Sequence, residues 1–276
     1  MSSTRFDSRN VLQQFRLDGR VALVTGAAGH LGRHISYALA AAGAHVVLNG
    51  RRRQPLDELA KEIGVLGHRA SVACFDITLS DLVASNVAEM SASLGRIDIL
   101  INNASAGRPG TLDTAGIKDF EASYRVNVVA AFDLLQTATP FLKEAAKKNA
   151  GGASVINVAS MYGTVSPNPA IYGRSGANSP PYYGAAKAGL IQLTRYAACH
   201  LAADGIRVNS ISPGTFPAEE YLQRDPDFRE QLNRKNPMHR VGEPPELAGP
   251  VLFLASDASS YVTGINLAVD GGWTAW

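Results

Sequence analysis

Seven short apolar runs alternate with longer segments of helical periodicity along this chain of 276 residues. The runs are rich in Val, Ile and Leu, which is typical of strands that a parallel sheet buries on both sides. The predicted strands are Arg20–Thr25, His45–Asn49, Ser71–Phe75, Ile97–Asn102, Ala153–Val158, Ile206–Ile211 and Ile265–Val269. This alternation predicts an α/β fold, a doubly wound parallel sheet of about seven strands with helices on both faces. No linker divides the chain, so residues 1–18 are interpreted as a polar leader and residues 19–276 as one domain.

The segments between these runs are predicted to be helices. Residues 31–42 carry apolar side chains at about one-turn spacing, and Gly43 follows as a helix-ending glycine. The other predicted helices are Leu56–Ile63, Leu79–Ser93, Ile117–Gln136, Tyr183–Ala203 and Pro244–Ala255. Two long loops, 161–181 and 213–225, each follow a predicted strand. Because open α/β sheets bind ligands at the carboxyl ends of their strands, we expect both loops to border a site.

The composition excludes several classes of protein. Lys and Arg total 26 against 24 for Asp and Glu, and this formal charge of +2 offers no concentrated basic field for nucleic acid or a membrane surface. The longest apolar stretch, Tyr37–Leu48, is too short to span a bilayer. Cys74 and Cys199 lie far apart, so we expect two small buried side chains in a reducing cytoplasm rather than a disulfide.

A glycine-rich turn follows the first predicted strand and opens the first predicted helix. Gly26, Gly29 and Gly32 allow a sharp turn and a close backbone approach to a pyrophosphate, which the N–H groups at the helix start would bind. The spacing predicts a dinucleotide site, and the alternative is an ordinary tight turn. His30 and His34 lie one helical turn apart, but without a third ligand they do not predict a metal site. We expect His30 near the pyrophosphate.

The end of the second predicted strand bears on the choice of cofactor. In this type of sheet an acidic residue there binds the adenosine ribose of NAD, whereas an arginine accommodates the 2′-phosphate of NADP. Here the strand runs into Arg51, Arg52 and Arg53 without an acidic residue. The sequence therefore favours NADP over NAD, with Arg51 as the phosphate ligand, and the alternative is a solvated basic turn.

Tyr183 and Lys187 lie four positions apart at the start of a predicted helix, so they share one face. A free tyrosine has a pKa of about 10, which is too high for a base at neutral pH. A neighbouring ammonium stabilises the phenolate and lowers that pKa, so the pair predicts a proton-transferring tyrosine. Tyr182 lacks such a partner, because the residue four positions further on is Ala186.

These features form part of an ordered set of motifs. The set comprises the glycine turn Thr25–Gly32, Asn102-Asn103-Ala104, Asn127 in a helix, Asn157–Ser160 after a strand, Tyr183 with Lys187, and Pro213-Gly214. From Leu17 to the C-terminus the chain resembles the short-chain dehydrogenase/reductase family, in its compact single-domain branch. The resemblance implies an NAD(P)-dependent oxidoreductase.

The resemblance also implies a role for each matching residue. Ser160 would polarise the substrate oxygen, Tyr183 would be the general acid or base, and Lys187 would lower the tyrosine pKa and bind the nicotinamide ribose. Asn127 would hold a proton-relaying water. The alternatives are a Ser160 that caps a helix and an Asn127 that satisfies core groups. The residues implied to bind the cofactor are Gly26, Ala28, Gly29, His30, Leu31, Arg51, Asp76, Ile77, Asn103, Ala104, Tyr183, Lys187, Pro213, Gly214 and Thr215.

The chain departs from the family pattern in three places. His30 stands where the compact branch has its middle glycine, and Ser105 replaces the glycine that closes the Asn-Asn-Ala motif. Ser160 and Tyr183 are 23 positions apart, more than the family usually shows, so the 161–181 loop is interpreted as an insertion beside the active site. Its polar and aromatic content suits a polyhydroxylated or anionic substrate, and the alternative is a surface or subunit-contact loop. The candidate substrate residues are Ser105, Tyr162 and Arg174.

The leading hypothesis is an NADP-dependent oxidoreductase that interconverts a secondary alcohol and a ketone. The insertion and the tyrosine segment are similar to gluconate and polyol dehydrogenases, so a sugar, sugar acid or polyol is the predicted small-molecule substrate. The alternative is a 3-oxoacyl carrier-protein reductase, although the small net charge offers no evident basic docking face. A second alternative is a catalytically silent dinucleotide sensor or scaffold, against which the intact Ser160, Tyr183 and Lys187 argue. The resemblance also implies a homo-oligomer, a tetramer or a dimer.

Overall fold

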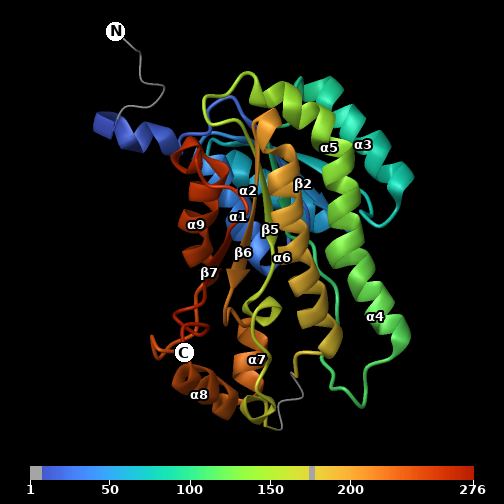
Figure 1. Ribbon diagram of the computed structural model, residues 1–276, viewed down its shortest axis with the longest axis vertical. Helices are drawn as coiled ribbons and strands as arrows, with labels where there is room; N and C mark the ends of the chain where they lie inside the picture. Colours follow the sequence, from blue (N-terminus) through green and yellow to red (C-terminus); the bar gives the residue numbers. More distant parts are fainter. Residues whose placement is uncertain (1–7, 174–177) are drawn as a thin grey trace.

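The computed structural model describes residues 8–173 and 178–276, and it contains a seven-stranded parallel sheet (Figure 1). The strands are β1 Val21–Val24, β2 His45–Gly50, β3 Arg69–Cys74, β4 Ile99–Asn102, β5 Ala153–Val158, β6 Ile206–Pro213 and β7 Asn266–Val269. They lie in the order β3-β2-β1-β4-β5-β6-β7, and Val24 faces both Leu48 of β2 and Ile101 of β4. The order reverses between β1 and β4, which is where an open α/β sheet binds its ligand.

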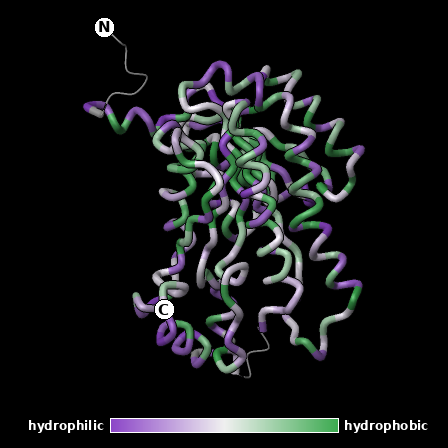
Figure 2. Tube along the Cα trace, in the orientation of Figure 1, coloured by the Kyte–Doolittle hydropathy of each residue, from purple (hydrophilic) through white to green (hydrophobic). Residues whose placement is uncertain are grey.

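Helices cover both faces of this sheet, which confirms the predicted doubly wound fold (Figure 1). They are α1 His30–Ala41, α2 Arg53–Val65, α3 Ser80–Leu94, α4 Ile117–Tyr124, α5 Ala130–Ala146, α6 Pro181–Leu201, α7 Glu219–Arg224, α8 Pro226–Lys235 and α9 Ala248–Ala255. Side chains alternate along each strand, so Leu23 joins the apolar cluster under α3, α5 and α6, whereas Val24 joins the one under α1, α2 and α9. Figure 2 shows hydrophobic residues concentrated around the sheet and a hydrophilic α8.

One predicted helix is interrupted. The sequence predicts a single helix over 117–136, but α4 and α5 are separated by a π-helix at Arg125–Val129, and α5 continues to Ala146. A π-helix carries one more residue per hydrogen-bonded turn, and such segments occur frequently at functional sites. Hydrophobic periodicity alone did not reveal this change, because the apolar stripe continues on both sides of it.

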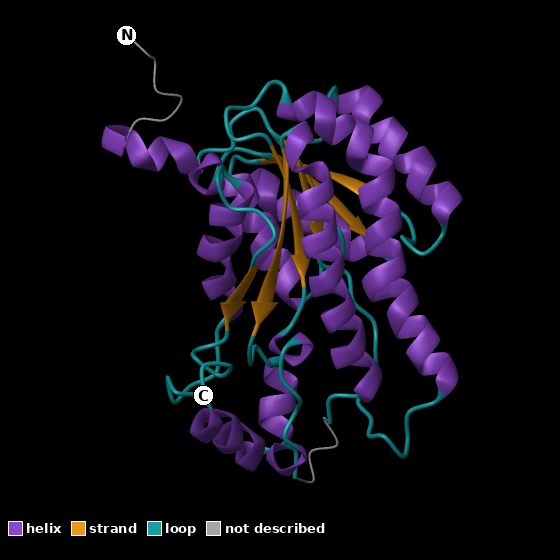
Figure 3. Cartoon of the chain, in the orientation of Figure 1, coloured by secondary structure: helices purple, strands orange, loops and turns teal. Residues whose placement is uncertain are grey.

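The two long loops contain more structure than the sequence predicted. The 161–181 loop includes 3-10 turns at Met161–Gly163 and Pro169–Ile171, and the 213–225 loop ends in α7, which α8 follows. The arrowheads of β6 and β7 point towards these two helices (Figure 3). Tyr172, Phe228 and Trp273 belong to a small apolar cluster that packs the 161–173 segment against α7 and α8. This cluster is separate from the two clusters that flank the sheet.

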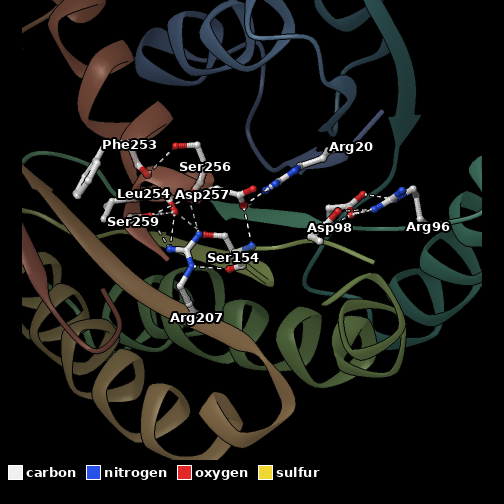
Figure 4. A network of polar contacts seen from close by, with 12 residues as sticks. Arg20, Arg96, Asp98, Ser154, Arg207, Phe253, Leu254, Ser256, Asp257 and Ser259 are labelled. Carbon is white, nitrogen blue, oxygen red and sulfur yellow. Dashed lines mark hydrogen bonds and ion pairs between the residues drawn. The ribbon is translucent and has the colours of Figure 1, made fainter. Parts of the chain in front are cut away.

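The amino ends of the strands hold buried charges (Figure 4). Arg20, directly before β1, pairs with Asp257 at 2.5 Å. Arg207 in β6 donates to the Ser259 hydroxyl at 2.7 Å and to three backbone carbonyl oxygens at 3.0 to 3.2 Å. Burial lowers the pKa of Arg207 to about 10, and the Asp257 carboxylate opposes this shift. Arg20 and Arg207 therefore both have fixed polar partners at this end.

In the part of the chain that the structure describes, no helix is long and apolar enough to cross a membrane. Both cysteines are free. Cys74 is partly buried and Cys199 is exposed, so the expectation of two buried cysteine side chains was wrong. Residues 8–15 form a 3-10 segment, and the division into a leader and one domain stays a prediction.

Candidate active site

The glycine turn joins β1 to α1 at the carboxyl edge of the sheet. Gly26 has a φ of +61°, and a Cβ on this residue would lie 3.0 Å from the Cα of Ala104. A Cβ on Gly32 would collide with the Gly26 carbonyl oxygen. Asn103 holds the turn, because its side-chain amide donates to the carbonyls of Thr25 and Gly26 at 2.9 and 3.1 Å. The turn is therefore a backbone cradle that tolerates no side chain at these glycines.

The first turn of α1 begins directly after this cradle. The N–H of Arg33 makes the first helical bond, to the Gly29 carbonyl at 3.0 Å. The N–H groups of His30, Leu31 and Gly32 precede it and lie outside the helical ladder. Such groups, with the positive end of the helix dipole, favour an anionic phosphate.

A cavity of about 770 Å³ opens in front of the cradle, and we call it the dinucleotide cavity. Its lining includes residues that follow β1, β2, β3, β4, β5 and β6. The predicted cofactor residues that line it are Gly26, Ala28, Gly29, His30, Leu31, Arg51, Asp76, Ile77, Asn103, Ala104, Tyr183, Lys187, Pro213 and Gly214. Ser160 and Ser105 line it as well. Thr215 does not; it is buried, and its hydroxyl has no hydrogen-bond partner among the described residues.

Exposed arginines line the dinucleotide cavity at the end of β2. Arg51 and Arg52 both border it, whereas Arg53 pairs with Asp57 at 3.6 Å inside α2. Asn49, one residue before the end of β2, is buried and donates to carbonyls at the end of β3, so the two strand ends are held together. The predicted basic turn therefore faces the cavity.

Ser160, Tyr183 and Lys187 meet at the opposite side of this cavity. Lys187 is buried, and its Nζ lies 5.7 Å from the centroid of the Tyr183 ring and donates to the Val158 carbonyl at 2.7 Å. Burial lowers the pKa of Lys187 to about 7. Burial also raises the pKa of Tyr183, which a hydrogen bond with Ser160 opposes and the nearby Tyr172 reinforces. Tyr183 is therefore a neutral phenol at neutral pH and a potential proton donor, whereas the sequence predicted a tyrosine whose pKa the neighbouring lysine lowers.

Ser160 and Asn127 also make the bonds that the structural alternatives predicted. The Ser160 hydroxyl accepts the N–H of Tyr162 at 3.1 Å and caps a 3-10 turn. Asn127 is buried in the π-helix, accepts the Ser105 hydroxyl at 2.9 Å and donates to the Ser123 carbonyl at 2.9 Å. Asn127 lines neither cavity described here, and it reaches the site through Ser105.

A second cavity of about 420 Å³ adjoins the first, and we call it the substrate-side cavity. The residues that line both cavities are Ser105, Ala106, Ser160, Tyr183 and Gly214. The Tyr162 hydroxyl lies 2.8 Å from that of Tyr172, whose ring stacks on Phe228 with centroids 5.8 Å apart. The other residues that line it include Arg108, Pro217 and Tyr221. The shared wall thus contains the serine and the tyrosine that the sequence singled out.

Several residues that line the two cavities belong to no motif and were not predicted from the sequence. Phe216 follows the Pro-Gly motif, and Tyr221 and Phe228 lie on the two helices that were not predicted. Short helices after a Pro-Gly pair carry little periodicity, so only the length of the loop signalled them. Arg174 lies outside the described residues.

His30 links two segments that line the dinucleotide cavity. Its Nε2 lies 3.1 Å from the Phe216 carbonyl oxygen, which can only accept, so this nitrogen carries the hydrogen. Both residues line the cavity, yet they are 186 positions apart. Among the residues that the structure describes, no group of three or more His, Cys, Asp or Glu side chains is placed to hold a metal ion.

These features fit a nicotinamide dinucleotide. The cradle excludes a Cβ where a pyrophosphate needs a close backbone approach, and arginines border one side of the cavity. A buried lysine beside a tyrosine and a serine borders the other side, where a hydroxyl or carbonyl could exchange a proton.

The chain is similar to known proteins over most of its length. Residues 26–274 match the family model described as Enoyl-(Acyl carrier protein) reductase. Galactitol 2-dehydrogenase (L-tagatose-forming) of Cereibacter sphaeroides is 38% identical over 267 residues, which cover 95% of this chain and 98% of that protein. The 3-oxoacyl-(acyl-carrier-protein) reductase FabG of Thermotoga maritima is 35% identical over 257 residues, covering 93% and 98%.

A solved structure is similar over its whole length. The gluconate 5-dehydrogenase of Burkholderia cenocepacia J2315, in complex with NADP and tartrate, has a TM-score of 0.86 and 33% identity and covers 97% of this chain and 100% of its own. The fold, the motif order and these matches agree with the resemblance that the sequence predicted. The chain belongs to the short-chain dehydrogenase/reductase family of NAD(P)-dependent oxidoreductases.

Proposed function

We propose that the protein is an NADP(H)-dependent oxidoreductase that interconverts a secondary alcohol and a ketone on a sugar, sugar acid or polyol. The observation that carries this proposal is the shared wall of the two cavities, in which Ser160 and Tyr183 border both. A group held in one cavity and a substrate held in the other would meet at this pair. When bound, the nicotinamide ring supplies or accepts the hydride.

In this proposal the side chains of the chain handle the oxygen and its proton. The Ser160 hydroxyl donates to the substrate oxygen and polarises it. Tyr183 gives its phenolic proton to that oxygen as a ketone becomes an alcohol, and takes it back in the reverse reaction. Lys187, when protonated, lowers the pKa of the tyrosine so that the reverse reaction has a base. Asn127 orients Ser105 at the shared wall and takes part in proton relay.

The choice of NADP rests on the arginines at the end of β2. Arg51 lines the dinucleotide cavity and is the proposed ligand of the 2′-phosphate, and a neighbour in the family was solved with NADP. Removing a charge-assisted bond should raise the KM for NADP by about tenfold to a hundredfold in Arg51→Ala and leave the KM for NAD nearly unchanged. Arg53→Ala is the matched control, since Arg53 pairs with Asp57. Equal responses to both cofactors in Arg51→Ala would refute the assignment.

The substrate class rests on two relatives and on the cavity. The relatives are named for galactitol and gluconate, and the residues that line the substrate-side cavity include the hydroxyl-bearing Tyr162, Tyr172 and Ser105. The test is a panel assay in which NADP is reduced with galactitol or gluconate and NADPH is oxidised with acetoacetyl-coenzyme A. Turnover of a polyol or sugar acid supports the proposal. Turnover of the thioester alone would favour the 3-oxoacyl reductase, to which the Thermotoga relative points.

We also propose a homo-oligomer, a tetramer or a dimer, in a reducing cytoplasm. The observation that supports self-association is the exposure of aromatic side chains on α5 and α6, where Phe132 and Tyr196 are 48% and 68% exposed. Light scattering coupled to gel filtration would measure the mass directly. A monomeric mass would refute this part of the proposal.

A further inference from the structure

Residues 105–110 belong to no helix or strand, and residues 105–109 of this segment form one wall of the substrate-side cavity. The segment is held at its two ends. The Ser105 hydroxyl donates to Asn127 at 2.9 Å, and the N–H of Gly110 donates to the Asn178 carbonyl at 2.9 Å. An irregular segment depends on such bonds for its position, because it has no ladder of its own. What holds its middle therefore decides the shape of this wall.

The Tyr182 hydroxyl holds the middle of the segment. It accepts the N–H of Arg108 at 3.1 Å and donates to the carbonyl of Arg108 at 2.7 Å. One phenol thus satisfies both backbone polar groups of a single residue, as a neighbouring strand would do. A tyrosine hydroxyl can do this because it is donor and acceptor at once.

The Tyr182 ring is itself fixed. It is only 3% exposed, and it meets the Phe120 ring edge-on with centroids 6.4 Å apart. A Cβ on Gly107 would lie 3.3 Å from this ring, so the segment passes close to its edge. The Arg108 side chain pairs instead with Asp119 at 2.9 Å. The bonds to Tyr182 therefore use only the backbone of Arg108.

We propose that Tyr182 is a positioning residue, whose hydroxyl fixes residues 105–109 as a wall of the substrate-side cavity and so sets substrate affinity. This inference rests on the proposed function, in which that cavity holds the substrate. Tyr182 precedes the proton-transferring Tyr183 in the first turn of α6, so the same turn places the reacting group and the wall beside it.

The first test compares Tyr182→Phe with Tyr124→Phe by hydrogen exchange. Tyr182→Phe keeps the ring and removes both bonds to Arg108. Tyr124→Phe removes a hydroxyl from a ring that stacks on Phe120 with centroids 5.8 Å apart, and it leaves those bonds in place. The Arg108 amide should exchange about tenfold faster in Tyr182→Phe only. Unchanged exchange at Arg108 would overturn the proposal, and this measurement needs no substrate.

The second test measures kinetics with galactitol or gluconate and NADP, or with acetoacetyl-coenzyme A and NADPH if only that probe is turned over. We expect Tyr182→Phe to raise the substrate KM by about threefold to tenfold, with kcat and the NADPH dissociation constant nearly unchanged. A structural role alone would lower kcat and weaken NADPH binding together. That result, or an unchanged KM, would overturn the positioning role. Failure of every probe with the unaltered enzyme would count against the proposed function, while hydrogen exchange still decides whether Tyr182 fixes the wall.

Discussion

Buried charged side chains have different partners at the two ends of the sheet. At the amino ends, Arg20 has a carboxylate at 2.5 Å, and Arg207 has a hydroxyl and three carbonyls within 3.2 Å. At the carboxyl ends, Lys187 is equally buried, but none of the ion pairs formed by the described residues includes it. A carboxylate or several acceptors stabilise the charged form of a buried side chain, whereas Lys187, whose Nζ donates to the Val158 carbonyl, can change its protonation at lower cost. We therefore expect variants at the amino end to affect stability and variants at the carboxyl end to affect activity.

The variant with the largest expected effect is Tyr183→Phe, which changes the site at the carboxyl ends of the strands. Loss of the transferable proton should lower kcat by about a hundredfold to ten-thousandfold, which is the range that general acid–base catalysis contributes. The NADPH dissociation constant and Tm should stay the same, because the ring is retained. Steady-state kinetics and fluorescence titration would measure both. Tyr261→Phe, at a fully exposed tyrosine, is the control, and near-normal activity of Tyr183→Phe would contradict the assigned role.

At the other end of the sheet, Asp257→Ala should lower the free energy of unfolding by about 3–5 kcal/mol, because it leaves the buried Arg20 without a counter-ion. The kcat of the folded protein should be unchanged, as Asp257 lines neither cavity. Denaturant titration would measure the loss. Glu230→Gln, which removes an exposed pair with Arg234, should cost less than about 0.5 kcal/mol. Equal losses from the two variants would remove the contrast between the ends.

Lys187→Met should change stability and activity in opposite directions. Burial lowers the pKa of Lys187 to about 7 in the folded protein, so at pH 7 folding works against the lysine charge and the variant should be more stable by about 1–2 kcal/mol. Because the unfolded lysine binds more protons than the folded one between pH 7 and about 10, the stability of the unaltered protein rises over this range. The advantage of the variant should therefore shrink as pH rises, while turnover is lost throughout. A variant that is less stable at pH 7 would show that Lys187 stabilises the fold.

The smallest expected effect concerns His30, which links the cradle to the segment after β6 through the Phe216 carbonyl. His30→Ala should weaken NADPH binding by about threefold to tenfold, because the lining of the dinucleotide cavity loses one bond. His30→Gln keeps an N–H donor and should retain most of the affinity. Fluorescence titration would measure both. Equal affinities for His30→Ala and the unaltered protein would show that the bond has no part in holding the cofactor.

The sequence predicts best those parts that depend on local chemistry. The bounds of β5 match the prediction residue for residue, since this run with its Val and Ile residues directly follows the break at Gly151 and Gly152. The glycine cradle and the Tyr183–Lys187 pair follow from short spacings, and the structure brings them to one cavity.

Other features depend on contacts between distant residues. The bonds of Tyr182 to Arg108 span 74 positions, and the stack of Tyr172 on Phe228 needs a helix that carries no clear periodicity. Neither a propensity nor a motif encodes such a pairing, so the substrate-side cavity was foreseen only as a long loop. The π-helix is not encoded in the apolar periodicity either, and its Asn127 accepts a bond from Ser105, 22 positions away.

The π-helix at Arg125–Val129 makes this part of the chain sensitive to length. Deleting one residue there would return the segment to an ordinary α-helix, in which each residue turns the following side chains by about 100°. Asn127 would then face away from Ser105, although its neighbours in the sequence had hardly changed. At these few positions, substitutions should therefore be tolerated more easily than the insertion or deletion of a residue.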